Sequence, residues 1–166
     1  MRRFFVISFS LLLFPALGSA QEFQQPRGVG YAFVAPGLAS ASGERTNTFQ
    51  FGGGGEGRIY KGLGAGAELG YLFPGKRFQD GFGLFSANGF YHFPSLIPSG
   101  KLIPFATGGY SGGFTREWGE NWFNFGGGVD YWFHQNVGLR LEVRDNVDPN
   151  HSQPLHLVGF RVGVIF

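Results

Sequence analysis

The sequence contains no cysteine, few charged residues and, after Gln21, no run of 18 apolar residues. The lack of cysteine excludes a disulfide framework and a thiolate metal site, and the short apolar runs exclude membrane-spanning helices. Only 14% of the 166 residues are charged, whereas 18% are aromatic and 30 are glycine. Abundant aromatic residues argue against disorder, and each glycine in a helix costs about 1 kcal/mol relative to alanine. The composition therefore predicts one all-β domain.

The first 20 residues have the three parts of a secretory signal peptide. Two arginines precede an apolar stretch at 4–14, and small residues lead up to Ala20. Because this stretch is shorter than the ~20 residues that a spanning helix needs, cleavage before Gln21 is favoured over an uncleaved anchor. We expect a signal peptide at 1–20 and an outer-membrane β-barrel domain at 21–166.

Removal of this segment changes the charge balance. The formal net charge of +2 is carried by its two arginines, so the mature chain has 11 basic and 11 acidic residues. A neutral chain lacks the basic footprint of nucleic-acid binding. We therefore expect an exported protein with no nucleic-acid partner.

Period-2 alternation of apolar and polar residues recurs in segments of about ten residues, separated by turn-forming residues. This pattern is typical of β-strands. It predicts eight strands, at about 28–39, 48–60, 63–73, 82–93, 102–111, 122–133, 137–145 and 155–166.

The charged residues of these segments all lie on the face opposite to the apolar residues, and four acids balance four bases. This set is Glu56, Arg58, Glu68, Asp130, Arg140, Glu142, Arg144 and Arg161. In a soluble sandwich or lipocalin-like barrel the charges would face water, whereas in a transmembrane barrel they would face the interior. An eight-stranded barrel is just wide enough for side chains to fill, so interior charges would have to pair with one another. A narrow pore or gate is the alternative.

Strand length and aromatic placement favour the transmembrane barrel. Segments of 10–12 residues match tilted strands that cross a bilayer, whereas soluble strands usually have about 5–6 residues. Aromatic residues gather near strand ends, as in an interfacial girdle; at one end these are Tyr91, Phe93, Tyr131 and Phe133. We therefore predict an eight-stranded antiparallel up-and-down transmembrane β-barrel.

The last segment resembles the C-terminal assembly signal of Gram-negative outer-membrane barrels. Its alternating residues are Phe160, Val162, Val164 and Phe166. The segments 88–94 and 104–109 are similar to the fourth and fifth strands of OmpA/OmpX-like barrels. The resemblance covers about residues 27–166, and it implies the cell outer membrane as location and the barrel-assembly machinery as a partner during biogenesis.

The same resemblance implies that both chain ends face the periplasm. The connections at 61–62, 94–101 and 134–136 would then be periplasmic turns. The external loops would be at about 40–47, 74–81, 112–121 and 146–154. Such short loops weaken an adhesin interpretation borrowed from OmpX-like proteins.

Residues with hydrolytic chemistry gather near the last external loop: Asp145, Asp148, His151, Ser152 and His156. Some eight-stranded outer-membrane barrels are lipid A hydrolases that use a histidine and a serine, but the His-x-Ser spacing of the lipid A deacylase family is missing here. His151 and Ser152 are adjacent and would point to opposite faces of a strand. We therefore expect no catalytic residues and a non-enzymatic protein.

The remaining histidines and tryptophans suggest no site. Four scattered histidines do not predict a metal centre, and neither a metal nor a cofactor is expected. His92 and His134 are interpreted as interface residues next to periplasmic turns. The three tryptophans are interpreted as loop or girdle residues: Trp118, Trp122 and Trp132.

The expected function is structural or surface-interacting, in a porin-like but closed barrel. Its partners would be outer-membrane lipid and lipopolysaccharide, and we expect a monomer. The alternatives are a lipid A-modifying hydrolase and a narrow channel or hydrophobic-ligand barrel.

Overall fold

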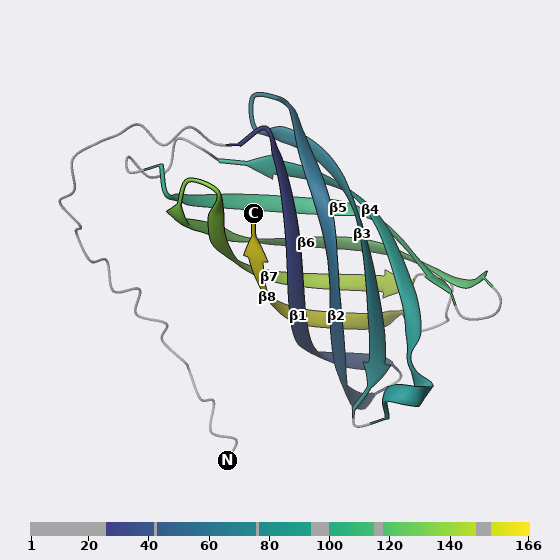
Figure 1. The fold of residues 1–166 in the computed structure, drawn as a ribbon. Helices are drawn as coiled ribbons and strands as arrows, with labels where there is room; N and C mark the ends of the chain where they lie inside the picture. Colours follow the sequence, from purple (N-terminus) through teal and green to yellow (C-terminus); the bar gives the residue numbers. More distant parts are fainter. Residues whose placement is uncertain (1–25, 42, 76, 94–99, 115–117, 149–153) are drawn as a thin grey trace, which may run out of the picture.

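The chain forms a closed antiparallel barrel in which each strand pairs with the next and the last pairs with the first (Figure 1). This computed structural model describes residues 26–41, 43–75, 77–93, 100–114, 118–148 and 154–166. The strands are β1 (Gly28–Ala41), β2 (Glu44–Tyr60), β3 (Leu63–Pro74), β4 (Phe82–His92), β5 (Leu102–Phe114), β6 (Trp118–His134), β7 (Val137–Asp148) and β8 (Leu155–Ile165). A short 3₁₀ helix, η1 (Phe78–Asp80), lies between β3 and β4. The predicted eight-stranded up-and-down barrel is therefore confirmed, and the predicted leader at 1–20 lies outside the described residues.

The barrel has two distinct ends. We call the end where β1 begins and β8 ends the terminal end, and the opposite one the loop end (Figure 1). Tight connections at 61–62 and 135–136 lie at the terminal end. No helix in the described part of the chain is long and apolar enough to cross a membrane.

Several strands extend further toward the loop end than the sequence pattern indicated. The predicted loop at 40–47 is wrong, because β1 continues to Ala41 and pairs there with Glu44. Gly43, with a φ of 85°, supplies the left-handed backbone that this tight hairpin needs. The predicted loops at 112–121 and 146–154 are likewise too long, because strand pairing continues to Phe114 and Trp118 at the first and to Asp148 and Leu155 at the second.

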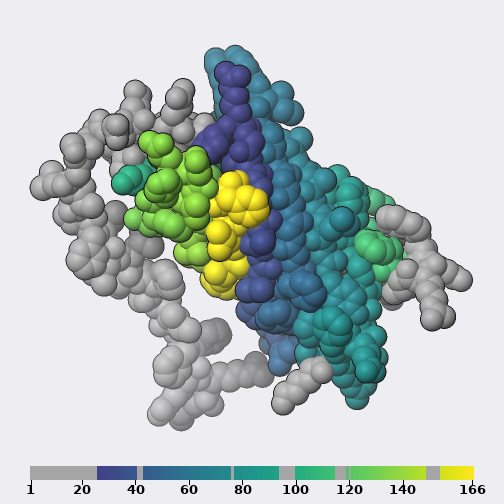
Figure 2. All heavy atoms as spheres, viewed as in Figure 1, coloured from purple at the N-terminus to yellow at the C-terminus, as the bar shows by residue number. Residues whose placement is uncertain are grey.

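The closure of the barrel joins β1 to β8. The amide of Gly30 donates to the carbonyl oxygen of Phe166 at 2.8 Å, and the amide of Phe166 donates back at 2.9 Å. The pairing reaches Ser40 and His156 near the loop end. Figure 2 shows the last strand, in yellow, lying against the purple first strand. This seam brings the two ends of the chain into one wall.

Apolar clusters close the interior near both ends. One cluster, at the terminal end, consists of Val29, Tyr31, Phe33, Ala35, Ile103, Trp132 and Ile165. The other, at the loop end, consists of Leu72, Leu84, Trp122 and Leu157, with Ala39, Phe82 and Leu155 packed against it. The interpretation of Trp122 and Trp132 as loop or girdle residues is wrong, because each is 1% exposed inside the barrel. Both have the parity of the inward-facing Asp130 in β6.

Glycines facing the interior allow close approach of neighbouring strands. A Cβ at Gly128 would clash with the carbonyl oxygen of Leu141, a backbone atom that cannot move aside, whereas a Cβ at Gly57 would meet nothing within 4 Å. We expect Gly128→Ala to lower the free energy of unfolding by about 1–3 kcal/mol. Gly57→Ala, at an exposed, outward-facing glycine of β2, is the control and should cause no loss. Urea unfolding in lipid vesicles measures the free energy of unfolding of both variants. Equal losses in Gly128→Ala and Gly57→Ala would contradict the proposed clash at Gly128.

Candidate functional site

An arginine from β7 binds two carboxylates from other strands inside the barrel. Arg140 donates from Nε to Asp130 Oδ1 at 2.7 Å and from Nη2 to Asp130 Oδ2 at 2.8 Å. It also donates to both carboxylate oxygens of Glu56, each at 3.1 Å. All three side chains are buried. Two carboxylates therefore share one guanidinium in a charge-assisted, bidentate arrangement.

Aromatic rings surround this guanidinium. Its central carbon lies 4.6 Å from the ring centroid of Phe105, 5.0 Å from that of Tyr31 and 5.7 Å from that of Phe90. A cation that has lost its water is stabilised by the negative ring faces. The rings also exclude water, which strengthens the ion pairs and makes an unpaired charge costly.

His92 completes the first network. Its Nε2 lies 3.2 Å from Glu56 Oε1 and 3.6 Å from Asp130 Oδ2. One ligand atom from each of the three side chains lies within 4.8 Å of the others, the spacing of a metal site. However, the guanidinium of Arg140 already donates to both carboxylates and supplies the positive charge that a metal ion would otherwise bring. The cluster is thus better suited to a charge network than to a metal centre.

A second network lies next to the first. Glu68 accepts from Arg161 Nη2 at 2.7 Å, pairs with Arg144 Nη1 at 3.1 Å and accepts from the Tyr31 hydroxyl at 3.1 Å. Glu142 pairs with Arg144 and, at 3.4 Å, with Arg161. Two acids and two bases therefore balance one another in a buried ring of contacts.

The two networks share one side chain. The ring of Tyr31 faces Arg140 of the first network, and its hydroxyl donates to Glu68 of the second. The ring of Phe33, two residues further along β1, lies 3.6 Å from the guanidinium carbon of Arg161. Inward-facing aromatic residues of β1 thus support both guanidinium groups.

A layer of neutral polar side chains adds further buried hydrogen bonds. Ser111 lies 2.8 Å from Ser86, accepts from Asn124 Nδ2 at 2.8 Å and donates to Asn146 at 3.2 Å. All four side chains are buried. Because each hydroxyl and amide has a partner, the layer ties β4, β5, β6 and β7 together without charge.

A small cavity lies among these layers. It is bordered by β1, β2, β3, β7 and β8 and has a volume of about 10 Å³, and Gln50, Leu72, Arg144, Leu157 and Arg161 belong to its lining. Such a volume accommodates about one water molecule. In the part of the chain that the structure describes, charged, polar and apolar side chains fill the lumen.

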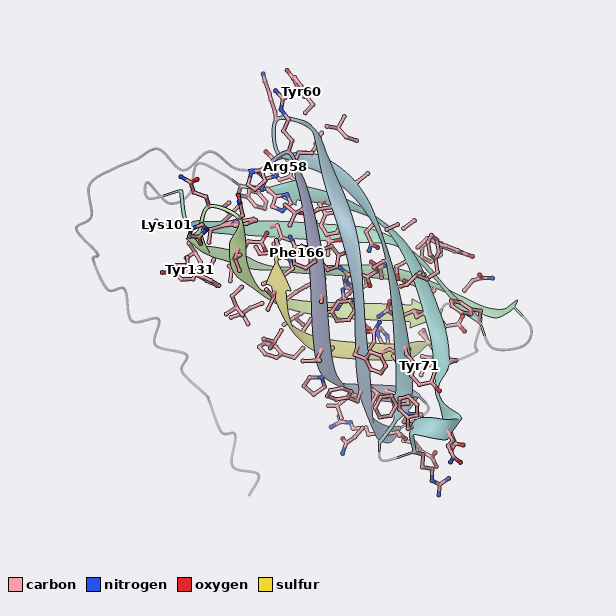
Figure 3. All side chains as sticks on the ribbon, viewed as in Figure 1. Arg58, Tyr60, Tyr71, Lys101, Tyr131 and Phe166 are labelled. Carbon is pink, nitrogen blue, oxygen red and sulfur yellow. The ribbon has the colours of Figure 1, made fainter. Side chains whose placement is uncertain are left out.

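The structure brings seven of the eight predicted interior charges into the two networks. The eighth, Arg58, is half-buried near the terminal end (Figure 3). Sequence reasoning missed Tyr31 and His92, which complete the networks. The interpretation of His92 as an interface residue is wrong, because its side chain is 1% exposed. Side chains alternate between the two faces along β4, and this alternation places His92 inside the barrel.

The other predicted residues face outward. Tyr91, Tyr131 and Phe133 are exposed, and Tyr91 packs edge-on against Phe93 with ring centroids 4.7 Å apart. In Figure 3, Tyr131 lies toward the terminal end, opposite to Tyr71. The residues predicted as the assembly signal alternate outward along and just after β8; these are Phe160, Val162, Val164 and Phe166. Their roles as girdle and signal stay predictions.

The fold is shared with small outer-membrane barrels. Neisserial surface protein A (NspA) matches with a TM-score of 0.64 at 19% identity, over 84% of this chain and 96% of that one. The N-terminal β-barrel domain of OprF from Pseudomonas aeruginosa matches with 0.56 at 18% identity, over 86% and 100%. Ail, the attachment invasion locus protein of Yersinia pestis, matches with 0.53 at 10% identity, over 84% and 97%. The resemblance to small eight-stranded outer-membrane barrels is confirmed at the level of the fold. Neither a protein-family model nor a curated protein sequence matches the chain.

Proposed function

We propose that this chain is a closed, non-conducting barrel of the outer membrane with a structural or surface-interaction role. The observation that carries the proposal is the filled interior. Two buried charge networks and a neutral polar layer fill the interior together with the two apolar clusters. No reactive group of these networks is left accessible, since their charged side chains are buried and paired. The interior is therefore suited to stability rather than to transport or catalysis.

The outward surface supports membrane insertion. Large apolar side chains are exposed along the strands, among them Leu69, Phe123, Val143, Phe160 and Val164. A soluble protein would not expose so many of them while burying its charges, whereas a transmembrane barrel has this arrangement. The location proposed from this surface is the outer membrane, with lipid and lipopolysaccharide as surroundings and the barrel-assembly machinery as a partner during biogenesis. We propose a monomer, because the sheet of one chain closes on itself and needs no second chain to complete the barrel.

An attachment role is the surface-interaction role that the comparisons suggest. One of the similar structures is named an attachment invasion locus protein. In this chain the hairpin between β1 and β2 extends the wall at the loop end, because pairing continues to Ala41 and Glu44. A surface partner would contact this end if the loop end faces outward.

Two measurements test the closed-barrel proposal together. After cell fractionation, the protein should be found with the outer membrane and should migrate anomalously on SDS gels until it is heated. Reconstituted in planar bilayers, it should add no conductance above that of the lipid, because side chains of the described residues pack the interior of this eight-stranded barrel. Recovery in the soluble periplasm would contradict the location, and steady single-channel currents would favour the alternative of a narrow channel.

A further inference from the structure

A histidine and an aspartate form a close pair near the loop end. His156 Nδ1 of β8 lies 2.7 Å from Asp145 Oδ2 of β7. The histidine side chain is 46% exposed and that of the aspartate 17%. A carboxylate bound at Nδ1 fixes the tautomer of the ring and leaves Nε2 free to accept a proton, as in hydrolases that use an activated serine.

Both side chains lie on the outer surface of the barrel. Leu157 is buried in the loop-end apolar cluster, so its neighbour His156 points outward. Arg144 and Asn146 are buried inside, so Asp145 between them also points outward. The pair is therefore separate from both interior charge networks.

The seam of the barrel places a serine beside this histidine. Ser40 of β1 is the register partner of His156, and its neighbour Ala39 packs against the loop-end cluster, so Ser40 points outward. Directly opposite residues of antiparallel strands have Cβ atoms about 4.5–5.5 Å apart. A rotation of the serine side chain spans the remaining distance to a histidine nitrogen, and such contacts often form only when substrate is bound.

An arginine lies beside Ser40 on the side opposite to His156. Arg45 of β2 is the register partner of Ser40 on its other side and is exposed. Partners in an antiparallel pair point to the same face of the sheet. The outer surface thus carries a base, a hydroxyl and a cation on three adjacent strands, with the orienting carboxylate on a fourth.

We propose that Ser40, His156 and Asp145 form an ester-hydrolysing site on the outer surface of the barrel, with Arg45 stabilising negative charge on the substrate. The proposal rests on the location given above, since it needs the loop end in the outer leaflet. It goes beyond the proposed function, because it adds a reaction to a barrel whose interior is inert. It differs from the sequence-based expectation that the chain has no catalytic residues, which stays a prediction, and the experiment below distinguishes the two.

The depth of the site points to a lipid ester as substrate. The next outward residues toward the middle of the barrel are Leu38, Val143 and Val158, all exposed and aliphatic. They lie two positions away, which corresponds to about 7 Å along the strands. The site therefore lies at the upper edge of the apolar band, the level at which acyl esters join lipid headgroups. Both glycerophospholipids and acylated saccharides present such esters.

The reaction follows from the positions of the groups. Ser40 Oγ attacks the ester carbonyl carbon while His156 Nε2 accepts the hydroxyl proton, and the carbonyl oxygen becomes negatively charged beside Arg45. The bond from this carbon to the alcohol oxygen breaks, and the histidine returns the proton to that oxygen. Water then attacks the acylated serine by the same route and releases the fatty acid.

The site is tested with the full chain folded in detergent micelles. Purified protein is incubated in parallel with phosphatidylethanolamine vesicles and with lipopolysaccharide, and released fatty acids are measured by mass spectrometry. We expect release from one of the two, which identifies the lipid class. Ser40→Ala and His156→Ala should reduce the rate to background, and Asp145→Asn should reduce it by about 10³–10⁴-fold.

A matched control is available on the neighbouring strand. Thr46 pairs with Ala39 and therefore faces the opposite side of the sheet from Ser40. Thr46→Ala should keep the wild-type rate, and heat-dependent migration on SDS gels shows that each variant is folded. The proposal is overturned if the folded wild-type protein releases fatty acid from neither lipid, or if Ser40→Ala retains the rate. Such a failure would not contradict the proposed closed-barrel function, because bilayer conductance and fractionation test that function separately.

Discussion

Replacing Arg140 by leucine is expected to lower the free energy of unfolding by about 3–5 kcal/mol. The guanidinium is the shared partner of Glu56 and Asp130, with donor–acceptor distances of 2.7–3.1 Å. Its loss would leave two buried carboxylates close together, with neither water nor a bidentate donor to balance them. Equilibrium unfolding by urea in lipid vesicles measures the effect.

Two comparisons show whether burial of the charges causes the expected loss of stability in Arg140→Leu. Arg77 has a side chain that is 82% exposed and lies 3.8 Å from Asp80, so Arg77→Leu should cost at most about 1 kcal/mol. Neutralising the whole first network in the triple variant Glu56→Gln, Asp130→Asn and Arg140→Met should recover most of the lost stability, since no unpaired charge remains. An Arg140→Leu variant as stable as Arg77→Leu would show that the carboxylates reach water.

The face of each charged strand could be predicted, because side chains alternate along a strand. Asp130 and Arg140 were assigned to the face opposite to the apolar residues, and that face is the interior. Which charged residues pair within each network could not be predicted. Glu56 and Arg140 are 84 residues apart on strands that are not neighbours. They meet across the lumen only because the barrel is closed and its strands are staggered. Closure and stagger together determine which residues of opposite strands lie at the same height in the barrel.

Position along a strand indicates the face of a residue better than residue type does, and the incorrect interpretations rest on residue type. Trp132 follows the inward-facing Asp130 by two residues, so alternation places it inside, yet its aromatic ring suggested a girdle. His92 lies in β4, which has no Asp, Glu, Lys or Arg to mark its inward face in the sequence. Ser40 and His156 come from the first and last strands, and only the closed seam makes them neighbours. Adjacency in sequence points instead to His151 and Ser152, which lie outside the described residues.

Replacing Glu68 by leucine is expected to destabilise the barrel by a similar amount, about 3–5 kcal/mol. The carboxylate is paired with Arg161 and Arg144 and accepts a hydrogen bond from Tyr31. Without it, two buried guanidinium groups would share only Glu142. Glu68→Gln keeps the shape and one acceptor but removes the charge, so it serves as the conservative comparison.

The Glu68 and Arg140 variants should not be additive, because Tyr31 contacts both side chains. Its hydroxyl donates to Glu68 and its ring faces the guanidinium of Arg140. Once Glu68 is gone, the ring is no longer fixed by its hydroxyl, and part of the support for Arg140 is already lost. A double-mutant cycle of Glu68→Leu and Arg140→Leu should therefore give a coupling energy of about 0.5–3 kcal/mol. The same cycle in a Tyr31→Leu background should give a smaller value; an unchanged coupling would mean that the two networks interact directly through their charges rather than through this ring.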